Sequence, residues 1–311
     1  MRIGGRYAVL WNGNDGAYTD ATQWTPEGVP LYDSSDSAVI RTGTVVLSNT
    51  EPNNIAISLG GASAATQPNL VLDNAALGPD VRLGLSPSTS NTNTPVGYGT
   101  ITVQGYDTNY GTISLGEANP APEAVTITIA PYGQLNQEGT INVGISPPLR
   151  VTGSGDAPAT LNNDGVINVL ENGQAIISVD VIGSGTIAFT SLPARFGSGY
   201  AELGAGVSSN QHVSFEGNSF AALRIDDPSA FHGVIDGFTS PTSAVTLANT
   251  QATGAYFAQI TPDSGALLVL NGQQVVDALT VSGAHPSNAY GVSNNTDGST
   301  TLRAVFPTPG S

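Results

Sequence analysis

The sequence predicts an all-β fold, a parallel β-solenoid (β-helix) with irregular coils, and three observations lead to this prediction. First, residues 134–143 return in degraded form at residues 160–169, each as a polar–apolar alternation, a Gly corner and a second short strand. Second, units this short cannot bury their own apolar face, which is typical of stacked coils. Third, no segment sustains a 3.6-residue apolar period beyond two turns, so helix is expected to be nearly absent.

Strands are predicted wherever four or five residues rich in β-branched side chains lie between Gly, Asn, Pro or Asp. They are expected at residues 55–59, 69–72, 81–85, 100–103, 112–115, 125–129, 140–143, 149–152, 166–169, 175–179 and 186–189. The uneven corner spacing indicates coils of about 20 residues. If residues 35–205 are all coil, about eight rungs at about 4.8 Å make a rod of about 40 Å. A β-sandwich built from the same strands is the alternative.

The charge balance restricts the partners. The chain has 24 acidic residues, eight arginines and no lysine, for a net charge of −16. Nucleic acids and anionic membrane surfaces are bound mainly by clustered Lys and Arg, so neither is expected as a partner. No stretch approaches the roughly 20 apolar residues of a membrane span. The chain has no cysteine, which excludes disulfides and thiolate metal sites.

Residues 1–34 are expected to form an opening and capping module. Trp11 and Trp24 flank a Gly-rich turn and an Asp-Ala pair, and Pro26 follows before the next strand. This order resembles the opening module of autotransporter passengers and haemagglutinin-like bacterial surface proteins. The two tryptophans would then cover the core at one end of the solenoid. Residues 12–16 are interpreted as a tight turn, because they lack the alternating acids and terminal Glu of an EF-hand.

Residues 206–311 contain a second pattern, centred on Asp-Asp-Pro. The stretch at residues 222–238 is similar to a module of very large secreted α-proteobacterial proteins. The resemblance implies that this C-terminal part continues the solenoid, with Phe231 and Phe238 in capping or assembly roles. The Asp-rich turn of those relatives is replaced here by Thr-Ser-Pro-Thr-Ser at residues 239–243. No cofactor is predicted, and calcium stays open as an alternative.

Catalysis is not predicted, and the protein is expected not to be an enzyme. No histidine lies in a nucleophile or metalloprotease motif. Glycoside cleavage needs two carboxylates about 5–10 Å apart, and Asp226, Asp227 and Asp236 are the candidates for that alternative. The adjacent pair before Pro228 is more simply explained as an Asx-type turn.

Binding by exposed aromatic rings is the other possibility that the sequence offers. Tyr98, Tyr106 and Tyr110 lie near glycine corners and are candidates for carbohydrate binding, although tyrosines at strand ends often pack their rings. Self-association has better support, since an open solenoid end is an unpaired row of backbone groups that templates another chain. Head-to-tail contacts of this kind build filaments when they do not close.

The sequence therefore predicts a non-enzymatic structural protein that is secreted or displayed at the cell surface. We expect an adhesin or a self-assembling surface or biofilm-matrix fibre subunit, with surface polysaccharide as a further partner. The alternative is a tailspike-like β-helix protein, of phage or bacterial type, that binds or cleaves polysaccharide.

Overall fold

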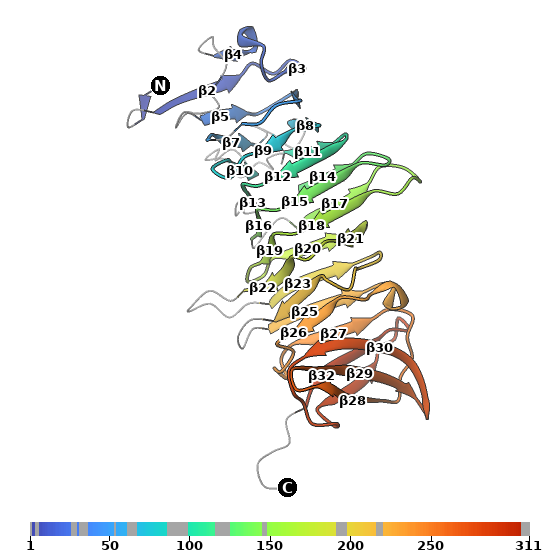
Figure 1. The fold of residues 1–311 in the computed structure, drawn as a ribbon. Helices are drawn as coiled ribbons and strands as arrows, with labels where there is room; N and C mark the ends of the chain where they lie inside the picture. Colours follow the sequence, from blue (N-terminus) through green and yellow to red (C-terminus); the bar gives the residue numbers. More distant parts are fainter. Residues whose placement is uncertain are drawn as a thin grey trace.

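The computed structural model shows a parallel β-solenoid of about seven turns, with strands stacked along one axis from the N-terminal to the C-terminal end (Figure 1). It describes residues 2–3, 6–25, 30, 37–52, 54–60, 67–85, 99–115, 125–144, 148–190, 198–215 and 220–305. The prediction of a parallel β-solenoid is confirmed, and the β-sandwich alternative is wrong.

Three sheets form the walls of the solenoid. Sheet 1 has 15 strands, in the order β1 (Arg2–Ile3), β2 (Arg6–Trp11), β5 (Ser37–Ile40), β7 (Ala56–Leu59), β10 (Arg82–Leu85), β13 (Thr112–Leu115), β16 (Thr140–Val143), β19 (Val166–Val169), β22 (Thr186–Phe189), β24 (His212–Phe215), β26 (Val234–Asp236), β30 (Gln274–Ser282), β29 (Ser264–Asn271) and β28 (Gly254–Thr261), with β4 (Trp24–Thr25) on β2. Sheet 2 has 12 strands, in the order β3 (Gly16–Ala17), β6 (Thr44–Ser48), β8 (Asn69–Asp73), β11 (Thr100–Val103), β14 (Val125–Ile129), β17 (Leu149–Gly153), β20 (Gln174–Ile177), β23 (Ser198–Leu203), β25 (Phe220–Ile225), β27 (Ala244–Leu247), β32 (Thr300–Ala304) and β31 (Tyr290–Asn294).

Sheet 3 is shorter and lies between the other two along each coil. Its five strands are β9 (Ala76–Leu77), β12 (Tyr106–Asn109), β15 (Gln134–Gln137), β18 (Thr160–Asn163) and β21 (Asp180–Ile182). Single bridges from Val181 to Val207 and from Val207 to Phe231 extend this wall toward the C-terminus. Two 3₁₀ turns, η1 (Ala21–Gln23) and η2 (Pro228–Ala230), complete the described elements.

Alternation with a period of two explains the strands of sheets 1 and 2. In β16 the apolar Ile141 and Val143 point into the core, while Thr140 and Asn142 face outward. The outward Asn142 Oδ1 accepts from the Nδ2 of Asn168, one coil later and 26 residues on, at 2.9 Å. Each predicted strand window coincides with an observed strand to within two residues.

Most coils are longer than the predicted 20 residues. Side chains on adjacent coils pair at separations of 28 residues (Asn142 to Ser114), 26 (Asn162 to Asn136) and 20 (Ser184 to Asp164). Each coil with a strand in sheet 3 needs three strands and three corners, so residues 35–205 hold seven strands of sheet 1, β5 to β22, where eight rungs were expected.

The corner between sheets 3 and 1 buries a column of amide side chains. Asn109, Gln137 and Asn163 occupy the same register position on successive coils and are fully buried. The Asn109 Nδ2 donates to Gln137 Oε1 at 2.7 Å. Asn and Gln residues, whose polar character is typical of loops, are therefore buried between the coils at this corner.

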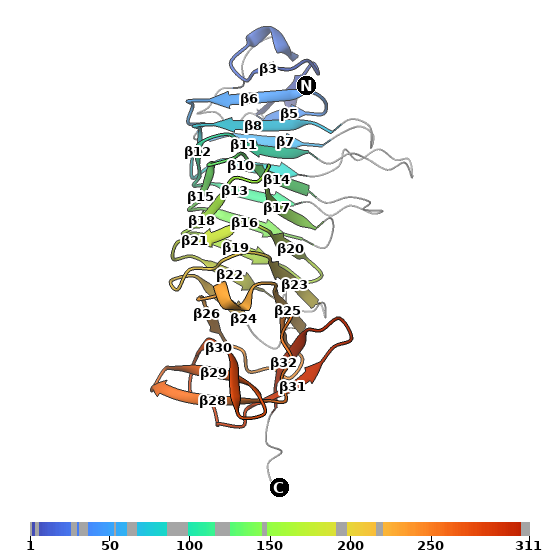
Figure 2. The ribbon, with the colours of Figure 1, turned by 90° about the vertical axis from the view of Figure 1, so that its right-hand side faces the viewer.

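Both ends of the solenoid are closed by chain reversal. At the N-terminus β1 and β4 pair with β2 in antiparallel fashion, over an aromatic cluster of Trp11, Tyr18 and Trp24. At the C-terminus β28–β30 form an antiparallel sheet, and β32 and β31 run antiparallel beyond β27. We call β28–β32 the C-terminal cap; its strands close the lower end of the molecule in Figure 2.

A buried carboxylate in sheet 3 predicts an unusual pH dependence. Asp107 is fully buried in a column that continues with Leu135 and Leu161. Its Oδ1 accepts from the Ala75 amide at 2.6 Å, and its Oδ2 has no hydrogen-bond partner among the described residues. Desolvation by burial raises the pKa of the Asp107 carboxyl above its ordinary value of 3.8.

We expect Asp107→Asn to stabilise the protein at neutral pH. Because the pKa of Asp107 is raised in the folded state, the folded protein keeps this proton to a higher pH than the unfolded chain does. The free energy of unfolding therefore falls as the pH rises from about 4 through the folded-state pKa. The substitution keeps an acceptor for Ala75 and removes the buried charge, so this fall should disappear. Urea unfolding measured between pH 3 and pH 7 tests this.

Asp164→Asn is the matched control, because the pKa of Asp164 is shifted in the opposite direction, downward. Backbone and side-chain hydrogen bonds from Ser184 lower the pKa of the Asp164 carboxyl. That carboxylate therefore contributes stability that is lost as pH falls through its folded-state pKa. An Asp107→Asn protein with an unchanged pH profile would contradict the burial argument.

Candidate functional site

The predicted carbohydrate-binding tyrosines do not form one cluster. Tyr106 and Tyr110 lie at opposite ends of β12 in sheet 3, and their side chains are 67% and 45% exposed. Four residues of strand separate them by about 13 Å. Tyr98 lies outside the described residues.

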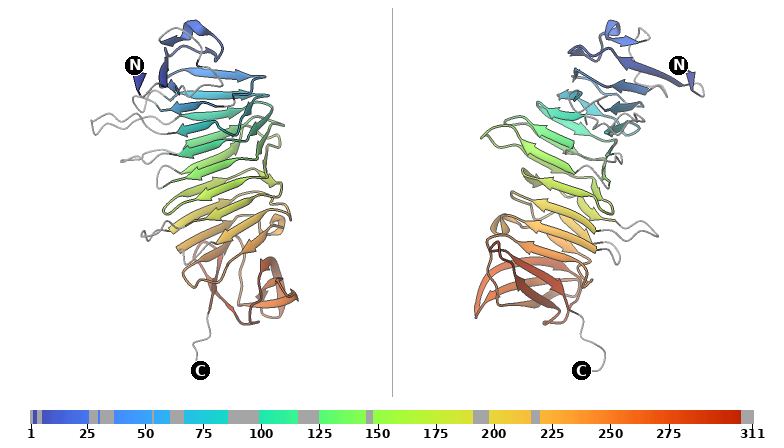
Figure 3. Two further views of the ribbon diagram at one scale, coloured as in Figure 1. Left: turned by 60° about the vertical axis from the view of Figure 1, so that its left-hand side comes forward. Right: turned by 180° about the vertical axis from the view of Figure 1, so that it is seen from behind.

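A third tyrosine, which the sequence reasoning missed, lies on the same side as Tyr106. Tyr132 precedes β15, one coil after Tyr106, and is 73% exposed. The register pairs Tyr106 with Gln134, which places Tyr132 diagonally across from it. Both residues border the corner between sheets 2 and 3. Figure 3 shows the coils stacked in chain order.

A groove with a volume of about 300 Å³ opens at this corner, one coil beyond Tyr132. The backbone N–H of Tyr132 donates to the carbonyl of Pro158 at 2.9 Å, and Pro158 lines the groove. The groove exists because corners of different length are stacked here. Residues 154–159 join β17 to β18, whereas only Ser178 and Val179 join β20 to β21.

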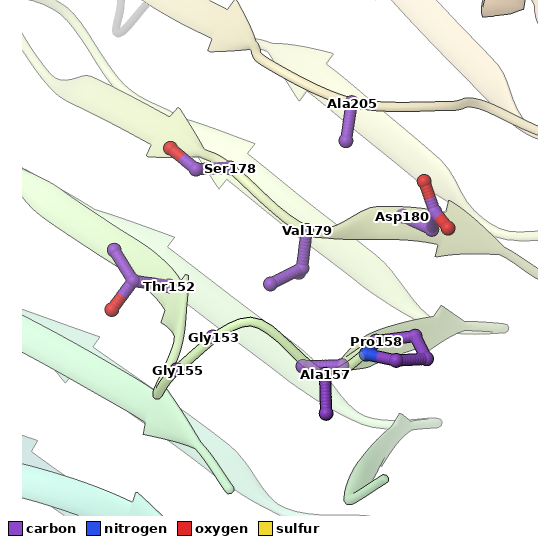
Figure 4. A pocket seen from close by; sticks show the side chains of 10 residues that line it. Thr152, Gly153, Gly155, Ala157, Pro158, Ser178, Val179, Asp180 and Ala205 are labelled. Atoms are coloured by element: carbon purple, nitrogen blue, oxygen red, sulfur yellow. The ribbon is translucent and has the colours of Figure 1, made fainter. Parts of the chain in front are cut away.

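The exposed lining of the groove is mostly polar. Val179 and Ala205 lie between the hydroxyl-bearing Thr152 and Ser178 on one side and Asp180 on the other (Figure 4). The Asp180 Oδ1 accepts from the Gly206 amide at 2.9 Å, which fixes the carboxylate. The site thus offers hydroxyl groups and a single carboxylate.

The carboxylates proposed for the cleaving alternative lie elsewhere, each with its own local partner. Asp226 Oδ1 accepts from the Arg224 Nε at 2.7 Å, and Asp236 Oδ2 lies 2.6 Å from the His212 Nδ1. Asp227 Oδ1 accepts from the Ser229 hydroxyl beside η2, in agreement with a turn. None of the three acids lines the groove at residues 152–205.

The residues assigned to capping or assembly are all buried. Trp11 and Trp24 meet edge to face, with ring centroids 4.9 Å apart. Phe238 stacks between Phe215 and Tyr290, and Phe231 ends the inner column of sheet 3. These side chains cover the core of their own chain, so a neighbouring molecule would have to contact other residues.

The Asn-Gly-rich loop at residues 12–16 is a turn that joins coils. Its Asp15 Oδ1 accepts from the Thr44 amide at 2.7 Å, and Gly13 has a φ of +97°. Across the described ranges, no three His, Cys, Asp or Glu side chains gather as a metal site would require. In the same ranges, no helix combines the length and apolar character needed to cross a membrane.

No family model matches the chain, and no curated protein is significantly similar to it. The solenoid and its surface are therefore the basis for a functional proposal.

Proposed function

We propose that this protein is a non-enzymatic structural rod of the secreted or cell-surface kind, acting as an adhesin or as a subunit of a surface or matrix fibre. The observation that supports the proposal most is the continuity of the ladder, which runs in parallel register from β2 to β26 in sheet 1. Such a ladder resists bending and pulling because each coil bonds to its neighbours along the axis. The net charge of −16 keeps the sides of separate rods apart.

The C-terminal cap offers the best surface for self-association. Its outermost strand β28 reads Gly-Ala-Tyr-Phe-Ala-Gln-Ile-Thr and carries neither charge nor proline. Natural edge strands usually carry such protecting residues. The Phe257 amide is occupied by the Ser287 carbonyl at 2.9 Å, while Ile260 further along is 72% exposed. A second molecule that paired with the free edge of β28, or packed against the Ile260 side chain, would join rods end to end.

Electron microscopy and sedimentation of the purified protein test this proposal. We expect concentration-dependent filaments or oligomers, and we expect Ile260→Lys to disperse them because a buried lysine in a strand interface is unpaired. Ile182→Lys, at an exposed position in sheet 3 midway along the rod, is the control and should assemble normally. A monomer at every concentration, or equal effects of both variants, would contradict self-assembly.

The second candidate, a polysaccharide-binding β-helix, is favoured by a separate observation. Exposed tyrosines and a groove lie together at the corner between sheets 2 and 3, away from the cap. An adhesin needs such a binding surface, so the two candidates are compatible. The cleaving form of this alternative has no comparable support.

A further inference from the structure

We propose that the corner between sheets 2 and 3 binds a neutral glycan, with Tyr132 as a stacking platform and the groove at Asp180 as a hydrogen-bonding subsite. This inference rests on the adhesive role proposed above and specifies the ligand class and the location.

The first argument is the chemistry of the groove. Thr152 and Ser178 supply hydroxyls, and Asp180 supplies a carboxylate that accepts hydrogen bonds only. Sugars offer many hydroxyl donors, which suit a carboxylate in a groove whose exposed lining is mostly polar. The volume of about 300 Å³ lies at the lower end of pockets that hold small ligands.

The second argument is charge, which selects against other ligands. Among the described residues that line the groove, Asp180 is the only charged one, and the whole chain carries −16. An anionic sugar such as a uronate would be repelled. A single carboxylate is also too few ligands for a calcium ion, which takes six to eight oxygens.

The third argument is the backbone of Tyr132. Five non-glycine residues among those described have positive φ, and four of them are asparagines, the residue type that tolerates this region best: Asn49, Asn74, Asn172 and Asn249. Tyr132 is the fifth, with a φ of +59°. A bulky residue in the left-handed region is strained, and such strain gathers at functional sites. A largely exposed ring at this position contributes little to packing, so binding is its remaining role.

The fourth argument is the arrangement along the axis. Tyr106, Tyr132 and Pro158 lie on three successive coils at the same corner, and the groove follows directly. Successive coils are about 4.8 Å apart, so an extended oligosaccharide lying along the axis would meet them in turn.

Isothermal titration calorimetry of the full chain tests the site with four probes. Maltohexaose, cellohexaose and hexa-N-acetylchitohexaose are neutral, and hexagalacturonate is anionic. We expect at least one neutral hexasaccharide to bind and hexagalacturonate not to bind. Tyr132→Asn and Asp180→Asn should each weaken binding by about tenfold. Asn suits the left-handed backbone at position 132, and at 180 it still accepts from Gly206, so both variants should fold.

Tyr256→Ala is the matched control, since Tyr256 is a half-exposed tyrosine on the C-terminal cap. It should bind like the unaltered chain. Binding of none of the neutral probes, tighter binding of hexagalacturonate, or unaltered affinity of Tyr132→Asn would overturn the inference. Filament formation is scored separately: assembly without glycan binding would refute only this site, and glycan binding by an unassembled chain would refute only the fibre.

Discussion

Phe238→Ala is expected to lower the free energy of unfolding by about 3–5 kcal/mol, the cost of truncating a fully buried aromatic side chain. Phe238 stacks on Phe215 of the last coils at 5.2 Å and on Tyr290 of the C-terminal cap at 5.3 Å. Its removal leaves a cavity at the joint between solenoid and cap. The Tyr290 hydroxyl also donates to the Phe238 carbonyl at 3.0 Å, and this bond depends on the same packing.

Urea unfolding gives the size of this effect, and limited proteolysis gives its location. We expect cleavage within residues 248–305 to speed up more than cleavage in the central coils, because the cap loses its contact with the coils. Phe220→Ala is the control: Phe220 is about half exposed at the start of β25, so its truncation should cost less than about 1 kcal/mol. Equal losses in the two variants would mean that the aromatic stack does not hold the cap.

The strands of sheets 1 and 2 were predictable because their own residues encode them. Windows such as Thr140–Val143 alternate β-branched and polar side chains, and every coil repeats that alternation. Sheet 3 was predicted only in part. The alternation at residues 134–137 and 160–163 indicated β15 and β18, but β12, Tyr-Asp-Thr-Asn, was missed because it contains no aliphatic residue. Its inward positions hold Asp107 and Asn109, whose burial depends on neighbours 26 or more residues away.

The alternation pattern also does not reveal the direction in which the last strands run. Strands at Tyr256, Leu268 and Val276 are apolar in the same way as those of the coils, yet they run antiparallel. The turn Asn271–Gly272 between β29 and β30 is a hairpin signal, and it was the clue available in the sequence. Antiparallel closure explains how the C-terminal core is covered without a helix.

The site was predicted only in part for a related reason. Tyr106 was found by its residue type, but Tyr132 gains its significance from a positive φ and from the groove beside Pro158. Both depend on which corners stack, and hence on a register that the sequence does not state. A tyrosine followed by glycine, at a corner where asparagine is the usual residue, is the only local sign.

Gly165→Ala is expected to destabilise the protein by about 3 kcal/mol, the upper end of overpacking costs. Gly165 belongs to a column with Gly111, Gly139 and Gly185, each of which precedes a strand of sheet 1. An added Cβ at Gly165 would overlap the Gly139 carbonyl oxygen and lie 2.7 Å from the carbonyl carbon of Glu138. These are backbone atoms held in the ladder, since the Val166 amide donates to the Gly139 carbonyl at 3.0 Å.

Gly84→Ala separates this close approach from any general effect of replacing glycine. The nearest atom to an added Cβ at Gly84 is the Ile57 carbonyl oxygen at 3.9 Å, which is ordinary contact, and its strand β10 lies in the same sheet. This variant should be neutral or slightly stabilising, because alanine reduces the freedom of the unfolded chain. Urea unfolding of both variants decides the matter. If they shift stability equally, coil spacing at this corner does not require glycine, and the recurrence of Gly before these strands of sheet 1 needs another cause.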